Sequence, residues 1–101
     1  MPITIYVTCP TKKEAQKIAT FLLKKHLIAC ATFFPIKSKF WWQGKIQSAD
    51  EVVTLLTTKK QNWQKVRDEI KKMHSYQVPC IEKTEFEATK EYEDWIKNVT
   101  K

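Results

Sequence analysis

The stretch from residue 29 to residue 58 constrains the fold of this 101-residue chain more than any other feature. Two strand-like segments, 29–42 and 45–58, lie on either side of Gly44, the only glycine in the sequence. The first segment is rich in aromatic residues and the second contains EVVTLLTT, and both compositions favour strands. Because WQGK predicts a tight turn with Gly44 at positive φ, the whole stretch predicts one long β-hairpin.

The predicted hairpin is too long for the sheet that it joins. Its strands of about thirteen residues would each extend roughly 43 Å, whereas the strand predicted at 3–9 has seven residues. Pro35 lacks a backbone N–H, so its strand is expected at a sheet edge or with a bulge there. A bulge is also expected in the second strand near Ser48–Asp50. The tip of the hairpin should therefore protrude beyond the sheet. Its apolar side chains are Phe40, Trp41, Trp42 and Ile46.

Capping motifs mark the starts of the helices. Thr11 and Glu14 form a capping box ahead of apolar residues at helical spacing. Thr58 and Gln61 repeat the motif ahead of a second helix. Thr89 is expected to cap a short helix at the end of the chain.

The predicted elements follow one another in the order β-α-β-β-α-β-α. Strands are expected at 3–9, 29–42, 45–58 and 78–88, and helices at 12–26, 60–74 and after residue 89. Two β-α-β units in this order indicate an α+β fold, the ferredoxin-like sandwich, as a single domain over 1–101. That fold implies an antiparallel sheet in the order 4-1-3-2, with the strands numbered along the chain.

A protruding aromatic hairpin cannot bury both of its faces within its own subunit. Neighbouring side chains on a strand point to opposite faces, so Phe40 and Trp42 share one face and Trp41 takes the other. Exposed apolar patches and unpaired strand edges usually mark interfaces. We therefore expect a homo-oligomer in which the hairpin docks on a neighbour. The alternative is a hairpin that curls over its own helices.

Three metal-binding side chains are expected at one end of the sheet. Cys9 ends the first strand, His74 ends the second helix, and Cys80 lies near the start of the fourth strand. In the ferredoxin-like topology these ends meet, and thiolate with imidazole suits copper or zinc. The start of the first helix can also lower the pKa of Cys9. The alternative is that the two cysteines are small buried side chains and that His74 is a helix-end residue.

Four segments of the sequence together match the pattern of a known family. CATFFPIKSKFWWQGKIQSADE, at 30–51, resembles a signature of Cys, Pro, Ser, Trp-x-Gly and Glu. VTCPTKKEAQKIA, at 7–19, resembles a V-T-x-P turn from strand to helix. HSYQVPCI and YEDWI, at 74–81 and 92–96, resemble the later segments of the same pattern. Over essentially its whole length, the chain resembles the CutA divalent-cation tolerance family.

This resemblance implies a homotrimer similar in outline to PII signalling proteins, with long hairpins that tie each subunit to the next. It also implies a role in tolerance of copper and other divalent cations, without an established catalytic reaction. The cleft between subunits would be lined, at matching positions of this sequence, by Trp42, His74 and Tyr76.

The sequence departs from the family pattern at two positions near this implied cleft. Thr57 stands where a lysine is usual, and Cys80 stands where an acidic residue is usual. Glu82 can supply the missing acid, because it lies two residues further on the same face of a strand. Cys80 adds a softer metal ligand than the carboxylate that it replaces.

Composition and missing motifs argue against other functions. The net charge is +7, but the lysines are scattered, which is typical of a solvated surface. RNA-recognition folds share this strand order but stack bases on strand aromatics, which EVVTLLTT lacks, so we expect no nucleic-acid partner. No Gly-rich phosphate loop and no G-x-S-x-G motif is present, so we expect no enzyme.

The cysteines and the hydropathy indicate a cytoplasmic protein. Three cysteines without paired spacing are typical of a reducing compartment. No secretory signal begins the sequence, and no apolar run approaches the ~20 residues of a membrane span. We therefore expect a trimeric metal-response protein that requires no cofactor and can bind copper or zinc. The alternative is a signalling or scaffold trimer whose metal binding is incidental.

Overall fold

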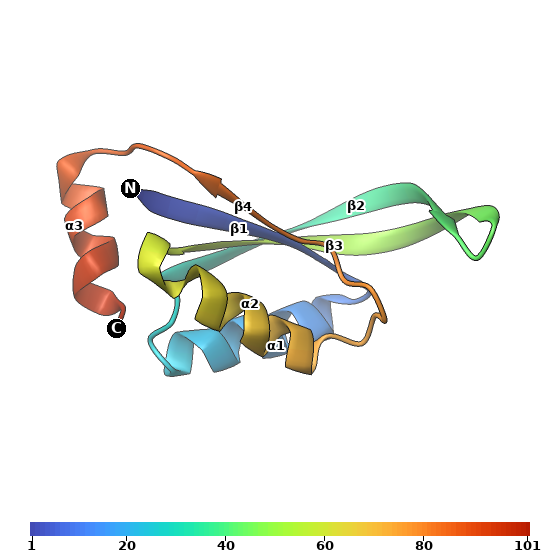
Figure 1. The fold of residues 1–101 in the computed structure, drawn as a ribbon, viewed down its shortest axis with the longest axis horizontal. Coiled ribbons are helices and arrows are strands. Elements are labelled where there is room, and N and C mark those ends of the chain that lie inside the picture. The colour runs from blue at the N-terminus through green and yellow to red at the C-terminus, as the bar shows by residue number, and fades with distance from the viewer.

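The chain forms one antiparallel sheet with two helices on one face and a third helix at one end. The computed structural model describes residues 1–101. The elements are β1 (Pro2–Cys9), α1 (Lys12–Lys24), β2 (Cys30–Trp42), β3 (Lys45–Lys59), the 3₁₀ turn Lys60–Asn62, α2 (Trp63–Met73), β4 (Ile81–Glu85) and α3 (Lys90–Val99) (Figure 1). The strands lie in the order β2-β3-β1-β4. The predicted α+β fold and sheet order are therefore confirmed.

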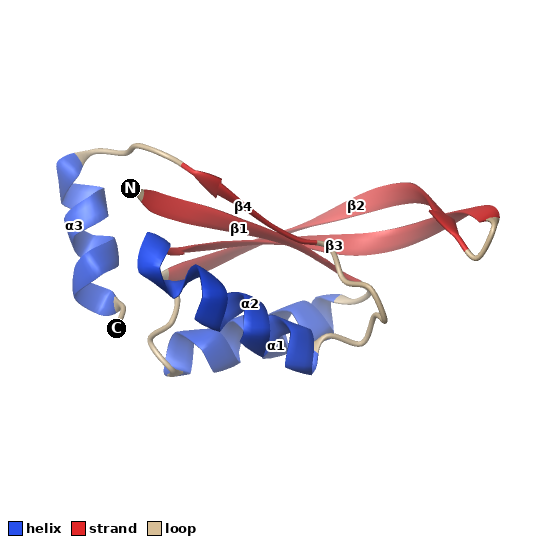
Figure 2. Cartoon of the chain, in the orientation of Figure 1, coloured by secondary structure: helices blue, strands red, loops and turns tan.

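The core lies between the sheet and the helices α1 and α2, which cover the same face (Figure 2). Ile3 and Ile5 of β1 and Leu56 of β3 have no exposed surface. Ile3, Ile5 and Leu56 form one cluster with Leu22 of α1 and Ile70 of α2. Burying a side chain of this size contributes about 1.5–3 kcal/mol to stability. The apolar residues at helical spacing in α1 and α2 are thus the ones that hold the helices on the sheet.

The first capping motif forms and the second does not. Thr11 Oγ1 accepts the N–H of Glu14 at 3.1 Å at the start of α1. The predicted cap by Thr58 is wrong, because Thr58 is fully buried in β3 and donates its hydroxyl to the Leu27 carbonyl at 2.7 Å. A 3₁₀ turn therefore leads into α2 without a side-chain cap, and α2 begins three residues later than predicted.

The fourth strand is shorter than predicted, and the last helix begins where predicted. β4 covers Ile81–Glu85 rather than 78–88. Pro79 stands before it, and a proline has no N–H to donate to a ladder. Thr89 caps α3 as expected, since its side chain accepts the N–H of Tyr92 at 3.4 Å.

The β2–β3 hairpin is long and regular. Every residue of β2 has a partner on β3, so the bulges expected at Pro35 and near Ser48–Asp50 are absent. Pro35 lies in the edge strand of the sheet, one of the two locations predicted for it, where a missing N–H is tolerated. The turn places Gly44 at φ 77°, as predicted.

The far half of the hairpin has no third strand beside it. β1 pairs with β3 only as far as Cys9 opposite Val52, so residues 36–51 form a two-stranded ribbon, called the arm below. Figure 1 shows the arm extending away from the helices along the longest dimension of the molecule, which measures 45 × 24 × 21 Å. The hairpin therefore does not curl over its own helices.

The arm leaves large apolar side chains uncovered within one subunit. Trp41 is 72 % exposed, Ile46 is 64 % exposed and Phe40 is 39 % exposed. Trp42, on the same face as Phe40, is half-buried. Of the two adjacent tryptophans, Trp41 is thus the one that lacks cover.

Candidate functional site

Two of the three predicted metal-binding residues meet at the end of β1. Cys9, the last residue of β1, is 1 % exposed, and His74 follows α2 with a fully buried side chain. Their ligand atoms and a carboxylate oxygen of Glu14 all lie within 4.8 Å of one another. Glu14 had been expected to complete the helix cap. Its carboxylate instead accepts the N–H of Ser75 at 3.1 Å, which turns it toward His74.

Hydrogen bonds define the tautomer of His74. Nε2 lies 2.8 Å from the carbonyl oxygen of Thr8, which can only accept, so Nε2 carries the proton. Nδ1 accepts the N–H of Tyr76 at 3.1 Å and therefore presents a lone pair. Nδ1 also lies 3.4 Å from Oε2 of Glu14. Two acceptor atoms thus face each other in a largely buried place, an arrangement that a cation between them would stabilise.

Burial keeps Cys9 a neutral thiol. Desolvation, with a smaller effect of the Glu14 carboxylate, raises the pKa of Cys9 to about 11. The expectation that the start of α1 lowers this pKa is therefore wrong, because burial outweighs the helix terminus. A metal that binds Cys9 has to displace the thiol proton.

Cys80 does not join the cluster of Cys9, Glu14 and His74. Its thiol donates to Oε2 of Glu82 at 3.2 Å. Burial and this hydrogen bond raise the pKa of Cys80 to about 11. The two side chains lie together, as their spacing of two residues predicted.

Tyr76 connects the cluster to Glu51 in β3. Its ring centroid lies 4.9 Å from that of His74, and its hydroxyl donates to Oε2 of Glu51 at 2.7 Å. Burial and the hydrogen bond to Glu51 raise the pKa of Tyr76 far above its ordinary value. Cys80 precedes Ile81, which pairs with Val7 of β1, so the Cys80–Glu82 pair lies toward the same end of the sheet. A set of metal-binding and acidic side chains, called the donor row below, thus lies at the base of the arm. It consists of Cys9, Glu14, His74, Tyr76, Glu51, Cys80 and Glu82.

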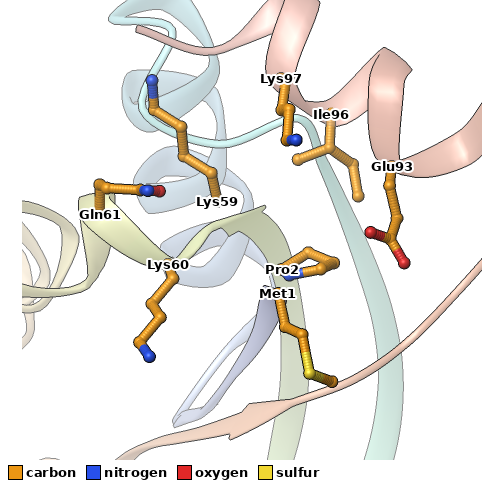
Figure 3. Close-up of a pocket in the computed structure, with 8 residues that line it drawn as sticks. All are labelled: Met1, Pro2, Lys59, Lys60, Gln61, Glu93, Ile96 and Lys97. Atoms are coloured by element: carbon orange, nitrogen blue, oxygen red, sulfur yellow. The ribbon is translucent and has the colours of Figure 1, made fainter. Parts of the chain in front are cut away.

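A small basic pocket lies at the other end of β1 (Figure 3). Its volume is about 150 Å³. Two of its charged groups already have partners, since Lys60 pairs with Glu85 at 3.7 Å and Glu93 accepts the N–H of Ala88 at 2.8 Å. The length of β1 separates this pocket from the donor row, so the two do not form one site. The pocket is lined by Met1, Pro2, Lys59, Lys60, Gln61, Glu93, Ile96 and Lys97.

Comparison with known proteins places the chain in a family. The model of the CutA1 divalent ion tolerance protein matches residues 3–99. The chain belongs to this family. The resemblance noted in the sequence is therefore confirmed over the whole fold, including the strand that carries Cys9 and the segment that carries His74 and Cys80.

Relatives and solved structures of the CutA family agree with this assignment. The divalent-cation tolerance protein CutA of Archaeoglobus fulgidus is 50% identical over 93 residues, or 91% of each chain. Its counterpart in Pyrococcus horikoshii is 36% identical over 100 residues, or 98% of each chain. A solved structure of the Archaeoglobus fulgidus protein matches this fold with a TM-score of 0.96 at 46% identity, over 98% of each chain.

The location of the protein in the cell stays a prediction. The Archaeoglobus fulgidus structure is described as that of a periplasmic protein. No helix of the present structure has the length and apolar character needed to cross a membrane.

One residue of the implied CutA cleft lies far from the other two within a single subunit. Trp42 ends β2, six positions beyond Ile36, which pairs with Glu51 beside Tyr76. Six residues of strand span roughly 20 Å. Trp42 can therefore line a common cleft with His74 and Tyr76 only if they come from different subunits.

The two departures from the CutA pattern do not coincide within one subunit. Thr57 pairs with Thr4 near the beginning of β1, whereas Ile81, next to Cys80, pairs with Val7. Thr4 and Val7 are three residues apart on β1, so the two positions differ by roughly 10 Å along the strand. The expectation that both changes act on one cleft therefore applies only to an assembly of subunits.

Proposed function

We propose that this protein acts in tolerance of divalent cations as a homotrimer, and that a metal ion or small ligand binds in a cleft between subunits. Membership of the CutA1 family supports the cation role, since the relatives are named for divalent-cation tolerance. The observation that carries the proposal is the donor row, which gathers two thiols, three carboxylates and an imidazole at the base of an arm that lacks cover.

Two separate apolar surfaces favour a ring of subunits over a two-fold dimer. The arm exposes Trp41 and Ile46 at one end of the molecule. At the other end (Figure 1), α3 exposes Tyr92 and Trp95, whose rings stack at 5.6 Å between centroids. A two-fold dimer joins one patch to itself, whereas a ring joins two different patches of each subunit. A homotrimer of the kind that the family resemblance implies uses both surfaces.

The donor row suits copper or zinc better than magnesium or calcium. Thiolate and imidazole are ligands of copper and zinc, whereas magnesium and calcium take oxygen ligands almost exclusively. The side chains that would serve in the cleft are His74 and Tyr76 of one subunit with Trp42 of a neighbour, and Cys80 with Glu82 nearby. The alternative function is a signalling or scaffold trimer in which metal binding is incidental.

Titration with copper or zinc, followed by native mass spectrometry, tests the proposed function. The expected result is a trimer that takes up about one ion per subunit, with weaker binding in His74→Ala or Cys80→Ser. If both variants bind copper and zinc as tightly as the wild-type trimer does, the proposed ligands are wrong. A wild-type protein that binds neither metal would contradict the cation role and leave the scaffold alternative.

We also propose a cytoplasmic location and the absence of enzymatic activity. The three free cysteines support a reducing compartment. The lack of a nucleophile motif in the sequence supports a binding protein rather than a catalyst. Cell fractionation tests the first of these points. Assay of the purified protein against ester and phosphate substrates tests the second.

A further inference from the structure

The buried cluster at the end of β1 contains two side chains, Cys9 and Glu14, that the proposed cleft between subunits does not use. Cys9, Glu14 and His74 all belong to one subunit and come from the end of β1, the first turn of α1 and the residue after α2. We propose that these three side chains form a binding site for a copper- or zinc-class cation inside each subunit. The inference rests on the proposed function in one respect, namely that the protein meets such cations.

The spacing of the ligand atoms fits a small metal ion. Metal–ligand bonds of about 2.0–2.3 Å in a tetrahedron place ligand atoms about 3.3–3.6 Å apart. His74 Nδ1 and Glu14 Oε2 are already 3.4 Å apart. The Cys9 sulfur lies within 4.8 Å of a ring nitrogen of His74 and of a carboxylate oxygen of Glu14, so it needs to move by no more than about 1.5 Å. The three atoms leave a fourth position of the tetrahedron for water.

The imidazole of His74 is oriented as in metal sites. A histidine ligand almost always donates its second ring N–H to a carbonyl or carboxylate, which fixes the tautomer and the ring plane. Here Nε2–H donates to the Thr8 carbonyl at 2.8 Å, and the acceptor Nδ1 faces Glu14. For His74, binding a metal requires that Nδ1 give up the hydrogen bond from the Tyr76 N–H.

A buried hydroxyl beside Cys9 gives an independent indication of a ligand. Thr54 is 2 % exposed, and its Oγ1 is buried without a hydrogen-bond partner. Buried polar atoms in native proteins almost always have a partner, so an exception needs an explanation. Thr54 pairs with Val7 of β1, so its side chain lies on the same face of the sheet as that of Cys9, two residues further on. A metal-bound thiolate would therefore give this hydroxyl a much stronger acceptor than the neutral thiol, whose sulfur accepts only weakly.

Charge balance favours a divalent cation. When the metal–sulfur bond forms, the Cys9 thiol proton leaves to solvent, and no oxidant or reductant takes part. Cys9 and Glu14 then carry two negative charges, which compensate a divalent ion in a place where an unpaired charge is costly. One sulfur, one nitrogen and one oxygen ligand select copper or zinc over magnesium or calcium. The ion can enter beside Glu14, whose side chain is 19 % exposed.

Cobalt(II) alone, added to the reduced, metal-free protein, tests this site by spectroscopy. Cobalt bound to a thiolate gives a charge-transfer absorption in the near ultraviolet, and zinc displaces it. The titration uses the Cys80→Ser protein, which lacks the thiol proposed for the cleft, and the expected result is one cobalt ion per chain with this band. In that protein the band should be lost on adding Cys9→Ala and kept on adding the matched control Cys30→Ala, because Cys30 lies at the start of β2 and outside the cluster.

Glu14→Gln keeps the test decisive if Cys9→Ala fails to fold. The amide oxygen can still accept the Ser75 N–H, but the charge is lost. Affinity for cobalt should then fall by at least about 10–100-fold. Losing a group that only hydrogen-bonds to a metal ligand already lowers metal affinity by this factor.

The outcomes separate this inference from the proposed function. A band that is lost in Cys80→Ser and kept in Cys9→Ala would overturn the site inside the subunit and leave the proposed cleft standing. Cobalt binding without any thiolate band would overturn the site inside the subunit and also the role of Cys80 in the cleft. A protein that binds neither cobalt nor zinc would overturn both.

Discussion

The β2–β3 hairpin has two halves that are built alike and covered differently. In the half that pairs with β1, Val53 is 1 % exposed and Leu56 is fully buried. In the arm, Trp41 is 72 % exposed and Ile46 is 64 % exposed. Both halves are regular strands in which every residue of β2 has a partner on β3. What differs is whether a third strand and two helices lie against them. In the proposed homotrimer, another copy of the chain would cover the arm.

The largest effect is expected in the covered half, for Leu56→Ala. Truncating a fully buried leucine removes its burial energy and leaves a cavity, so the free energy of unfolding should fall by about 2–5 kcal/mol. Urea denaturation measures this change. Ile46→Ala in the arm is the matched variant, and in the dissociated chain it should change the unfolding free energy by less than about 0.5 kcal/mol. If the two variants lose the same free energy of unfolding, the covered half and the arm do not differ in how their side chains are buried.

Trp41→Ala should act on assembly rather than on folding. A tryptophan buried at an interface commonly contributes about 2 kcal/mol or more, so the dissociation constant of the assembly should rise by at least about tenfold. Sedimentation over a dilution series measures this rise, and far-ultraviolet circular dichroism should stay unchanged. Lys39→Ala, on the same face of β2, is the control and should assemble as wild type. An unchanged assembly in Trp41→Ala would mean that the arm is not the contact.

Thr58→Val tests the polar part of the covered half with little change of shape. It removes the hydroxyl that donates to the Leu27 carbonyl at 2.7 Å and accepts from Asn62 Nδ2 at 3.2 Å. Leaving buried partners with fewer hydrogen bonds should lower the unfolding free energy by about 1–3 kcal/mol. Thermal unfolding of the variant measures this loss. A melting temperature equal to that of wild type would show that these two hydrogen bonds do not stabilise the fold.

The smallest effect is expected for Lys37→Ala in the arm. Lys37 pairs with Asp50 at 2.9 Å, but the two side chains are 88% and 83% exposed. Solvent and salt screen such a pair, so neither the melting temperature nor its salt dependence should change measurably. A clear loss of assembly in this variant would indicate instead that the pair is buried against a neighbour.

Much of the fold follows from local sequence signals. Alternating apolar residues, the Thr11 cap and the only glycine place the strands, the first helix and the hairpin turn close to where the structure has them. The exceptions depend on contacts distant in the chain. Thr58 looks like a helix cap, but burial beside Leu27 gives its hydroxyl another partner. The bulges inferred from local residue types are absent because β3 supplies a partner for every residue of β2.

The candidate site could be predicted only in part. The topology brings Cys9 and His74 together, because the end of β1 and the end of α2 meet at one edge of the sheet. Glu14 was assigned to the helix cap, since no sequence pattern shows that Ser75 holds its carboxylate in another direction. Glu51 is the last residue of the family-like segment at 30–51, and nothing else in the sequence marks it as a site residue. Its hydrogen bond to Tyr76 joins residues that are 25 positions apart. Burial, which raises the pKa of Cys9, depends on the packed core rather than on neighbouring residues.

The mass of the wild-type protein in solution tests most directly whether the arm is covered by other copies. Sedimentation equilibrium at micromolar concentration should give three times the 12.0 kDa of one chain. The same measurement on Trp41→Ala should shift the mass toward a single chain on dilution. A wild-type mass of one chain at micromolar concentration would contradict the account, since the arm would then remain exposed in the native protein.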